Sequence, residues 1–212
     1  MSTAAMMRWC RPGTDPTGPD QPRPDPEGPT VPQYVGREDY YAAAIAILSG
    51  SGAHELTMTA LHRGLGVSSG SFYNWFRNWP DFVERFLEHW RGSTEAIARE
   101  AAGPHDPHER LELLRRLSRT VPHDAEAAIR VWATTDPAVA EAQRAVDARR
   151  LEVIRRAVAA AGAPDAADEL AELCLSAVVG AQLRHRPVDV EGLDRVLARF
   201  IALVEAHSGR PD

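Results

Sequence analysis

Apolar residues along most of the chain recur at the three- and four-residue spacing of an amphipathic helix. The clearest case lies near the C-terminus, where one face carries Leu193, Val196, Leu197, Phe200, Ile201 and Val204. No segment shows the two-residue alternation of a strand, and Pro, Gly or Asp stands at the boundaries between periodic segments. The pattern predicts an all-α fold with helices near 37–48, 58–64, 68–76, 80–102, 107–120, 124–134, 137–161, 165–185 and 190–207.

The beginning of the chain differs from the rest in composition. Residues 1–34 hold eight of the 16 prolines and few apolar side chains. Proline cannot join helix or sheet ladders, and a segment without apolar residues cannot offset the entropy lost on ordering. We interpret residues 1–35 as a disordered Pro-rich tail; a start codon assigned too far upstream explains the segment equally well.

The segment Thr57–Phe76, TMTALHRGLGVSSGSFYNWF, has the pattern of two short helices joined by a tight turn. Thr57 precedes an apolar-periodic run and can cap its first helix. Gly66 stands where that helix should end, at a position that favours positive φ. Ser68 can cap the second helix. This is the layout of a helix-turn-helix, the element that places a helix in the DNA major groove.

The second helix of this motif combines small polar residues with aromatic ones. Small residues at 68–71 allow its N-terminus to approach a phosphate or a base edge closely, and free N–H groups there attract anions. Phe72 and Phe76, four residues apart, are expected to face inward. Tyr73 and Asn74 offer a hydroxyl and an amide, which are usual partners of phosphates and bases.

The stretch from Arg37 to about Trp90 resembles the DNA-binding domain of the TetR (tetracycline-repressor-like) transcription regulators. The matching residues follow one another without a gap: Arg37, Ala44, Ile47, Leu48, Gly52 and Thr57, then GLGVSSGSFYNWF. Two positions depart from the family pattern. His62 replaces a residue that is usually small, and Trp79 replaces a phosphate-binding Lys, a contact that Arg77 would take over.

The resemblance implies a three-helix DNA-binding domain at 36–96 and a helical effector-binding and dimerisation domain at 97–212. It implies a sequence-specific regulator of transcription without enzymatic activity or cofactor, acting as a repressor that a small-molecule effector releases from a palindromic double-stranded operator. The alternative is an effector-independent or architectural DNA-binding protein of the same fold. The expected DNA contacts are Arg37, Thr57, Ser68, Ser69, Gly70, Ser71, Tyr73, Asn74, Trp75 and Arg77.

The family also pairs its last two long helices with those of a second copy, which implies a homodimer. Here those helices, near 165–185 and 190–207, each carry an apolar stripe, the second ending in Phe200, Ile201 and Val204. An intramolecular core would give the same periodicity. DNA symmetry favours the dimer independently, because one short helix reads few bases and two heads read a palindrome.

Other candidate chemistry is sparse. Trp90 and Trp132 would line a cavity for a largely apolar effector, although both would serve equally well as plain core. His105, His108 and Glu109 offer too few convergent ligands for a metal, and we interpret them as a solvated loop and helix start. Cys174 lies on an apolar stripe and is interpreted as a small core residue. No catalytic triad or Gly-rich phosphate loop occurs, so an enzyme is the least supported class.

The net charge of −6 is unusual for a DNA-binding protein. Residues 36–79 carry three Arg and three acidic residues, so the expected reading domain is neutral and its affinity should be moderate and salt-sensitive. No apolar run reaches the length of a membrane span, no signal-peptide core is evident, and the cysteines are Cys10 and Cys174 only. We expect a cytoplasmic, nucleoid-associated bacterial protein.

Overall fold

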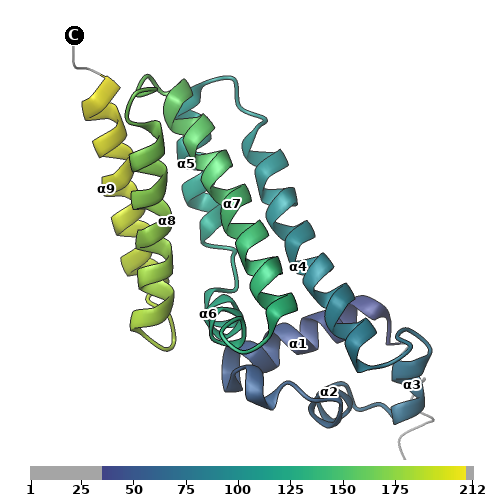
Figure 1. Cartoon of the computed structure of the whole chain (residues 1–212). Helices are drawn as coiled ribbons and strands as arrows, with labels where there is room; N and C mark the ends of the chain where they lie inside the picture. Colours follow the sequence, from purple (N-terminus) through teal and green to yellow (C-terminus); the bar gives the residue numbers. More distant parts are fainter. Residues whose placement is uncertain (1–34, 209–212) are drawn as a thin grey trace, which may run out of the picture. The chain divides into compact units, whose positions relative to one another are not determined.

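The computed structural model describes residues 35–208, and every regular element in that range is helical. The predicted all-α fold is therefore confirmed, while residues 1–34 of the predicted tail lie outside the described range. The α-helices are labelled in Figure 1, and the elements in chain order are α1 (Arg37–Ser51), the 3-10 turn η1 (Ala53–Glu55), α2 (Met58–Leu65), α3 (Ser69–Tyr73), α4 (Trp79–Ala101), α5 (Pro107–Ser118), α6 (His123–Trp132), α7 (Pro137–Ala160), α8 (Ala167–Arg184) and α9 (Val190–Ser208).

Two helix ends differ from the sequence prediction. α1 continues through Gly50, where we expected a turn, because a glycine weakens a helix without breaking it. It stops at Gly52, whose φ of 87° only glycine adopts readily. α3 ends at Tyr73, three residues before the predicted Phe76, because the chain must straighten into Asn78, which has an extended backbone.

An aromatic core holds together the N-terminal head, which comprises α1, η1, α2, α3 and the first half of α4. Tyr40, Phe72 and Phe76 are almost completely buried, as are Phe82 and Phe86 from α4. Their rings meet edge to face: the centroids of Tyr40 and Phe76 lie 5.5 Å apart, and those of Phe76 and Phe82 lie 5.0 Å apart. Such contacts add to the hydrophobic gain, and they tie the short α3 to two long helices.

The joint between α3 and α4 is fixed by one carboxylate. The Asn78 side chain caps α4 by accepting a hydrogen bond from the Asp81 amide at 2.9 Å. Asp81 in turn accepts from the Arg77 amide at 2.9 Å and from the guanidinium groups of Arg77 and Arg85. The hydrogen bond from the backbone amide of Arg77 lowers the pKa of Asp81, and the guanidinium groups of Arg77 and Arg85 lower it further. Burial acts in the opposite direction, and the pKa falls from 3.8 to about 2.

The C-terminal bundle comprises the second half of α4 and helices α5–α9. α7 packs against α4 and α8, α9 packs against α5 and α8, and α6 packs against α1 of the head. The expected domain boundary at 96/97 falls inside the unbroken α4. Residues 35–208 belong to one compact unit, so head and bundle share α4 as a structural element.

A buried polar network joins four helices of this unit. The Glu126 carboxylate on α6 accepts hydrogen bonds from the Trp90 indole of α4 at 3.1 Å, from the Arg150 guanidinium of α7, and from the Gln182 amide of α8 at 3.3 Å. Burial alone would raise the pKa of Glu126, but the bonds and charge of Arg150 outweigh it and the pKa is lowered. Glu126 therefore stays ionised in the interior.

Replacing Asp81 with Asn should destabilise the protein at neutral pH, because two guanidinium groups and the Arg77 amide lose their anionic acceptor. Since the folded pKa lies below the unfolded one, the stabilisation is present above about pH 4 and is lost as the pH falls towards 2. In urea unfolding at pH 7, Asp81→Asn should have a lower midpoint than wild type. At pH 3 the difference between the two midpoints should be smaller. The exposed Asp165, replaced with Asn, is the control; a constant gap between wild type and Asp81→Asn would contradict the assignment.

Candidate nucleic-acid interface and interior cavity

The turn between α2 and α3 has the geometry that the sequence predicts. Thr57 caps α2, its hydroxyl accepting from the Ala60 amide at 3.1 Å. Gly66 ends α2 in the left-handed region, with φ 66° and ψ 27°, and the amide of Val67 donates to the His62 carbonyl at 3.1 Å. The chain thus reverses within three residues and presents α3 on the surface.

One side of α3 packs against the aromatic core, and the other side faces solvent. Phe72 is fully buried in the aromatic core, whereas Ser68, Ser69 and Gly70 are exposed and Ser71 is half-buried. Their side chains extend little beyond the backbone, so a flat or grooved partner can come close to the helix. Ser68 occupies the N-cap position, but its side chain makes no capping bond.

Tyr73 and Asn74 lie at the far end of α3. The Tyr73 side chain is 58% exposed, and its ring meets Phe72 edge to face at 5.6 Å. This contact orients the ring, and more than half of the residue remains open to solvent. Asn74 is exposed and follows the last helical residue as its C-cap, so it belongs to the end of the motif rather than to the body of α3.

Trp75 requires a correction. Its indole N–H, which we expected to face a phosphate, donates to the Val35 carbonyl at 3.0 Å. The guanidinium of Arg37 lies over the Trp75 ring, 5.9 Å from its centre. Trp75 therefore holds the start of α1 against the end of the motif, and the exposed Arg37 carries the charge at this place.

Arg77 remains available in part. Its Nε and one terminal nitrogen bond to Asp81, while 79% of the side chain is exposed. The carboxylate thus orients the guanidinium, and its other terminal nitrogen points to no bonding partner among the described residues. A guanidinium held in this way is suited to a single phosphate contact.

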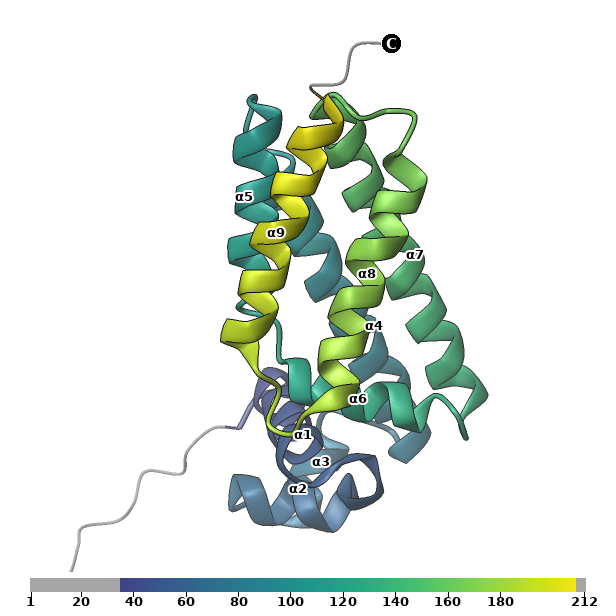
Figure 2. The ribbon, with the colours of Figure 1, turned by 90° about the vertical axis from the view of Figure 1, so that its left-hand side faces the viewer.

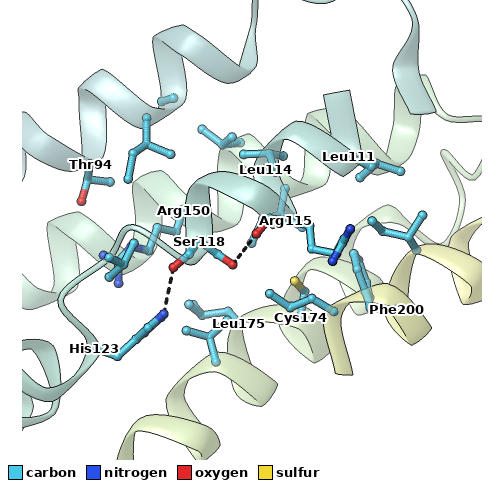
Figure 3. A pocket seen from close by; sticks show the side chains of 18 of the residues that line it. Thr94, Leu111, Leu114, Arg115, Ser118, His123, Arg150, Cys174, Leu175 and Phe200 are labelled. Atoms are coloured by element: carbon cyan, nitrogen blue, oxygen red, sulfur yellow. Dashed lines mark hydrogen bonds between the residues drawn. The ribbon is translucent and has the colours of Figure 1, made fainter. Parts of the chain in front are cut away.

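The bundle contains a partly open cavity of about 120 Å³ between α4, α5, α7, α8 and α9, with His123 of α6 at one end. Figure 3 shows Leu111, Cys174 and Phe200 toward one end, and Ser118, His123 and Arg150 toward the other. Most of the lining is apolar. Burial raises the pKa of the Cys174 thiol to about 12, so this cysteine is not a reactive thiolate at neutral pH.

The polar end of the cavity is internally satisfied. Arg130 Nε donates to Gln182 Oε1 at 3.0 Å, Gln182 Nε2 donates to His123 Nδ1 at 3.1 Å, and His123 Nε2 donates to the backbone carbonyl of Ser118 at 2.9 Å. This chain requires neutral His123, and burial lowers the pKa of that imidazole. Arg130 and Arg150 are paired with Asp147 and Glu126. The cavity presents no uncompensated charge.

Neither predicted tryptophan lines this cavity. Trp90 is buried between α4 and α6, and its indole N–H donates a hydrogen bond to Glu126. Trp132 lines a different groove, near the head. The cavity wall instead includes the apolar stripes of α8 and α9, with Cys174 and Phe200, beside apolar residues of α4, α5 and α7. The spacing of apolar residues in the sequence identifies such a stripe, but it does not show whether the stripe lines a cavity.

The same fact corrects the expected dimer face. Phe200, Ile201 and Val204 are buried inside the chain rather than displayed to a second copy. Other apolar side chains are exposed on α8 and α9, which lie side by side in Figure 2: Leu173, Leu183, Val196 and Leu203. We name these four residues, with the small Gly180 between them, the α8–α9 outer face.

Asp106 caps α5 by accepting from the amides of His108 and Glu109, which explains the polar cluster there, and residues 35–208 contain no group of three or more potential metal ligands. No helix within that range is long and apolar enough to cross a membrane.

Comparison with known proteins identifies the fold. No protein-family model matches the sequence, and no curated protein matches it. A transcriptional regulator from Rhodococcus sp. Rha1 superposes with a TM-score of 0.68 at 21% identity, over 84% of this chain and 100% of its own. A putative TetR-family regulator from Rhodococcus sp. gives 0.65 at 19% identity, over 80% and 98%. FadR from Bacillus subtilis, solved with stearoyl-CoA, gives 0.59 at 11% identity, over 81% and 99%. This chain therefore has the fold of TetR-type transcriptional regulators.

Proposed function

We propose that this protein is a sequence-specific DNA-binding regulator of transcription that acts as a repressor in the bacterial cytoplasm. The observation that carries the proposal is the exposed α3, anchored by Phe72 and set by the Gly66 turn, within a fold shared with transcriptional regulators. A helix held in this way can enter the major groove without deforming.

The exposed and half-buried residues around α3 divide into two groups of DNA contacts. Thr57, Tyr73 and Arg77, with Arg37 at the start of α1, offer donors around α3 and are assigned to phosphates. Ser69, Gly70 and Ser71, with Ser68 and Asn74 at the ends of α3, are assigned to base edges and to close backbone approach. Phosphate contacts position the head, and base contacts provide sequence preference.

Replacing Tyr73 with Phe should weaken binding to every duplex by a similar factor, roughly tenfold for one lost bond to a charged group. The salt dependence should not change, because no charge is lost. Arg77→Gln should also reduce the slope of log affinity against log salt by about 1. The measurement is fluorescence anisotropy at several salt concentrations, using a duplex selected from a random pool and a scrambled one.

Tyr40→Phe is the matched control within the same head. The Tyr40 hydroxyl is buried and has no hydrogen-bond partner, so its removal should leave DNA binding intact and stability equal or higher. The assigned interface would be contradicted if Tyr73→Phe bound DNA with wild-type affinity. Equal losses of DNA affinity in Tyr73→Phe and Tyr40→Phe would contradict it as well.

We propose further that the protein binds DNA as a homodimer through the α8–α9 outer face. Four large apolar side chains are exposed there, and a side chain at Gly180 would extend into open space. A second copy could therefore approach closely at Gly180. Two heads would then read the two halves of a palindrome.

A double substitution, Leu173→Glu with Leu183→Glu, should convert the protein to a monomer without unfolding it, because both side chains are exposed in the single chain. Operator affinity should fall with dimerisation. Sedimentation at micromolar concentration measures the assembly, and circular dichroism checks the fold. Val131→Glu, which changes an equally exposed apolar residue on α6, should stay dimeric; a monomeric wild type would refute the proposal.

The interior cavity supports release by a small apolar effector. Its lining has no unpaired charge, so an uncharged molecule or an apolar chain is the fitting occupant. FadR, which shares the fold, holds stearoyl-CoA. The cavity lies beside α4, which continues into the head, so an occupant that prefers one α4 position changes the position of α3. A coupling of about 1–3 kcal/mol would lower operator affinity by ~5–150-fold.

Filling the cavity should abolish ligand binding. Val178→Phe places a ring where the lining residue Val178 now leaves space. Benzene and indole should raise the thermal midpoint of wild type and lower its operator affinity, and should do neither in Val178→Phe. Val131→Phe, on the exposed surface, is the control and should respond like wild type.

The volume of about 120 Å³ favours one alternative, effector-independent DNA binding, because ligand pockets are usually ~300–1,000 Å³. A larger effector would require α4, α5 and α9 to separate. If neither probes nor a wider apolar screen shifts the midpoint or releases DNA, this alternative is preferred.

A further inference from the structure

A second hollow lies on the outside of the protein, where the head meets the bundle. It is a solvent-open groove of about 680 Å³, lined by η1, the first three turns of α4, the end of α6 and the start of α7. Two half-buried tryptophans, Trp79 of α4 and Trp132 of α6, contribute to its walls. The groove is larger than the cavity of the bundle, and its lining includes none of the proposed DNA contacts and no residue of the α8–α9 outer face.

Negative charge in this groove is only partly compensated. Asp136 caps α7, and Glu141 pairs with Arg144. Glu84 and Glu88 have no hydrogen bond or ion pair with any described residue. Arg91 is the single basic residue in the lining. The groove thus has two engaged carboxylates, two unengaged ones and one guanidinium.

The two unengaged carboxylates stand four residues apart on the same helix. Like charges at this spacing face each other and destabilise a helix by a few tenths of a kcal/mol. An acid pair on an open surface would need no explanation, but here it borders a groove with two indole rings. A cation in the groove would remove the repulsion between the carboxylates, and the indole faces would attract the same charge.

The lining also selects the kind of cation. An inorganic ion needs several oxygen ligands converging on one point, and residues 35–208 provide no such group. An organic ammonium ion requires only diffuse negative potential and aromatic or aliphatic surface, which Trp79, Trp132 and Val83 supply. An anion would meet Glu84 and Glu88 directly and is excluded by repulsion.

We propose that the groove between α4, α6 and α7 is a binding site for a monovalent organic ammonium ion with an apolar substituent. The ammonium group lies near Glu84 and Glu88, and the apolar part lies against Trp79 and Trp132. This site differs in chemistry from the interior cavity, which suits an uncharged molecule. Its occupancy does not depend on whether the protein binds DNA.

The test is a titration of ¹⁵N-labelled full-length protein with benzyltrimethylammonium, following the indole N–H signals of the tryptophans. The signals of Trp79 and Trp132 should shift and saturate, while that of Trp90, buried and bonded to Glu126, should stay in place. N-benzylacetamide, a neutral compound of similar size, should bind at least tenfold more weakly.

Two exposed substitutions, Glu84→Gln and Glu88→Gln, should together weaken benzyltrimethylammonium at least tenfold without affecting the fold. Glu100→Gln changes an exposed acid near the other end of α4 and should bind like wild type. Trp132→Leu should also weaken binding; if it fails to fold, the glutamate pair carries the test. Equal affinity for the neutral compound, shifts that miss Trp79 and Trp132, or unchanged binding by the double variant would each overturn the proposal.

Discussion

The arrangement of head and bundle depends on one buried carboxylate. Glu126 is 2% exposed, and its partners come from three other helices: Trp90 of α4, Arg150 of α7 and Gln182 of α8. Its own helix, α6, rests on α1 of the head. Loss of the carboxylate would leave the largely buried Arg150 unpaired, a change that typically costs about 3–5 kcal/mol. The position of α6 between the cavity and the head therefore follows from an electrostatic requirement.

Arginine serves this protein in a way that lysine would not. The chain has 24 basic residues, all of them arginine, and forked pairs join helices at several levels: Arg149 with Glu95, and Arg130 with Asp147. A guanidinium donates two parallel bonds to one carboxylate and so fixes the orientation of both side chains. These pairs specify how far one helix slides along the next, which apolar packing alone leaves loosely defined.

The parts of the structure that sequence could predict are those set by near neighbours. Thr57 caps a helix through a residue three positions away, and Gly66 ends it through its own φ, so the motif and the all-α fold are readable from local pattern. The bond from Trp75 to Val35 joins residues 40 positions apart, and that from Trp90 to Glu126 spans 36. Periodicity likewise placed Phe200 on the apolar face of its helix but did not show which residues that face contacts. For this reason the sequence could not tell the residues of the cavity wall from those of the proposed dimer face.

Asp81 gives α4 a mechanical role. Because its carboxylate holds the Arg77 amide and guanidinium, the end of the helix-turn-helix motif and the first turn of α4 are joined without a hinge. The 23 residues of α4 form a rod of roughly 35 Å at 1.5 Å per residue. A tilt of about 5° near Ala98, beside the cavity, would move the other end of such a rod by ~3 Å. A displacement too small to disturb packing in the bundle is thus amplified at the start of α4, where the helix-turn-helix motif is attached.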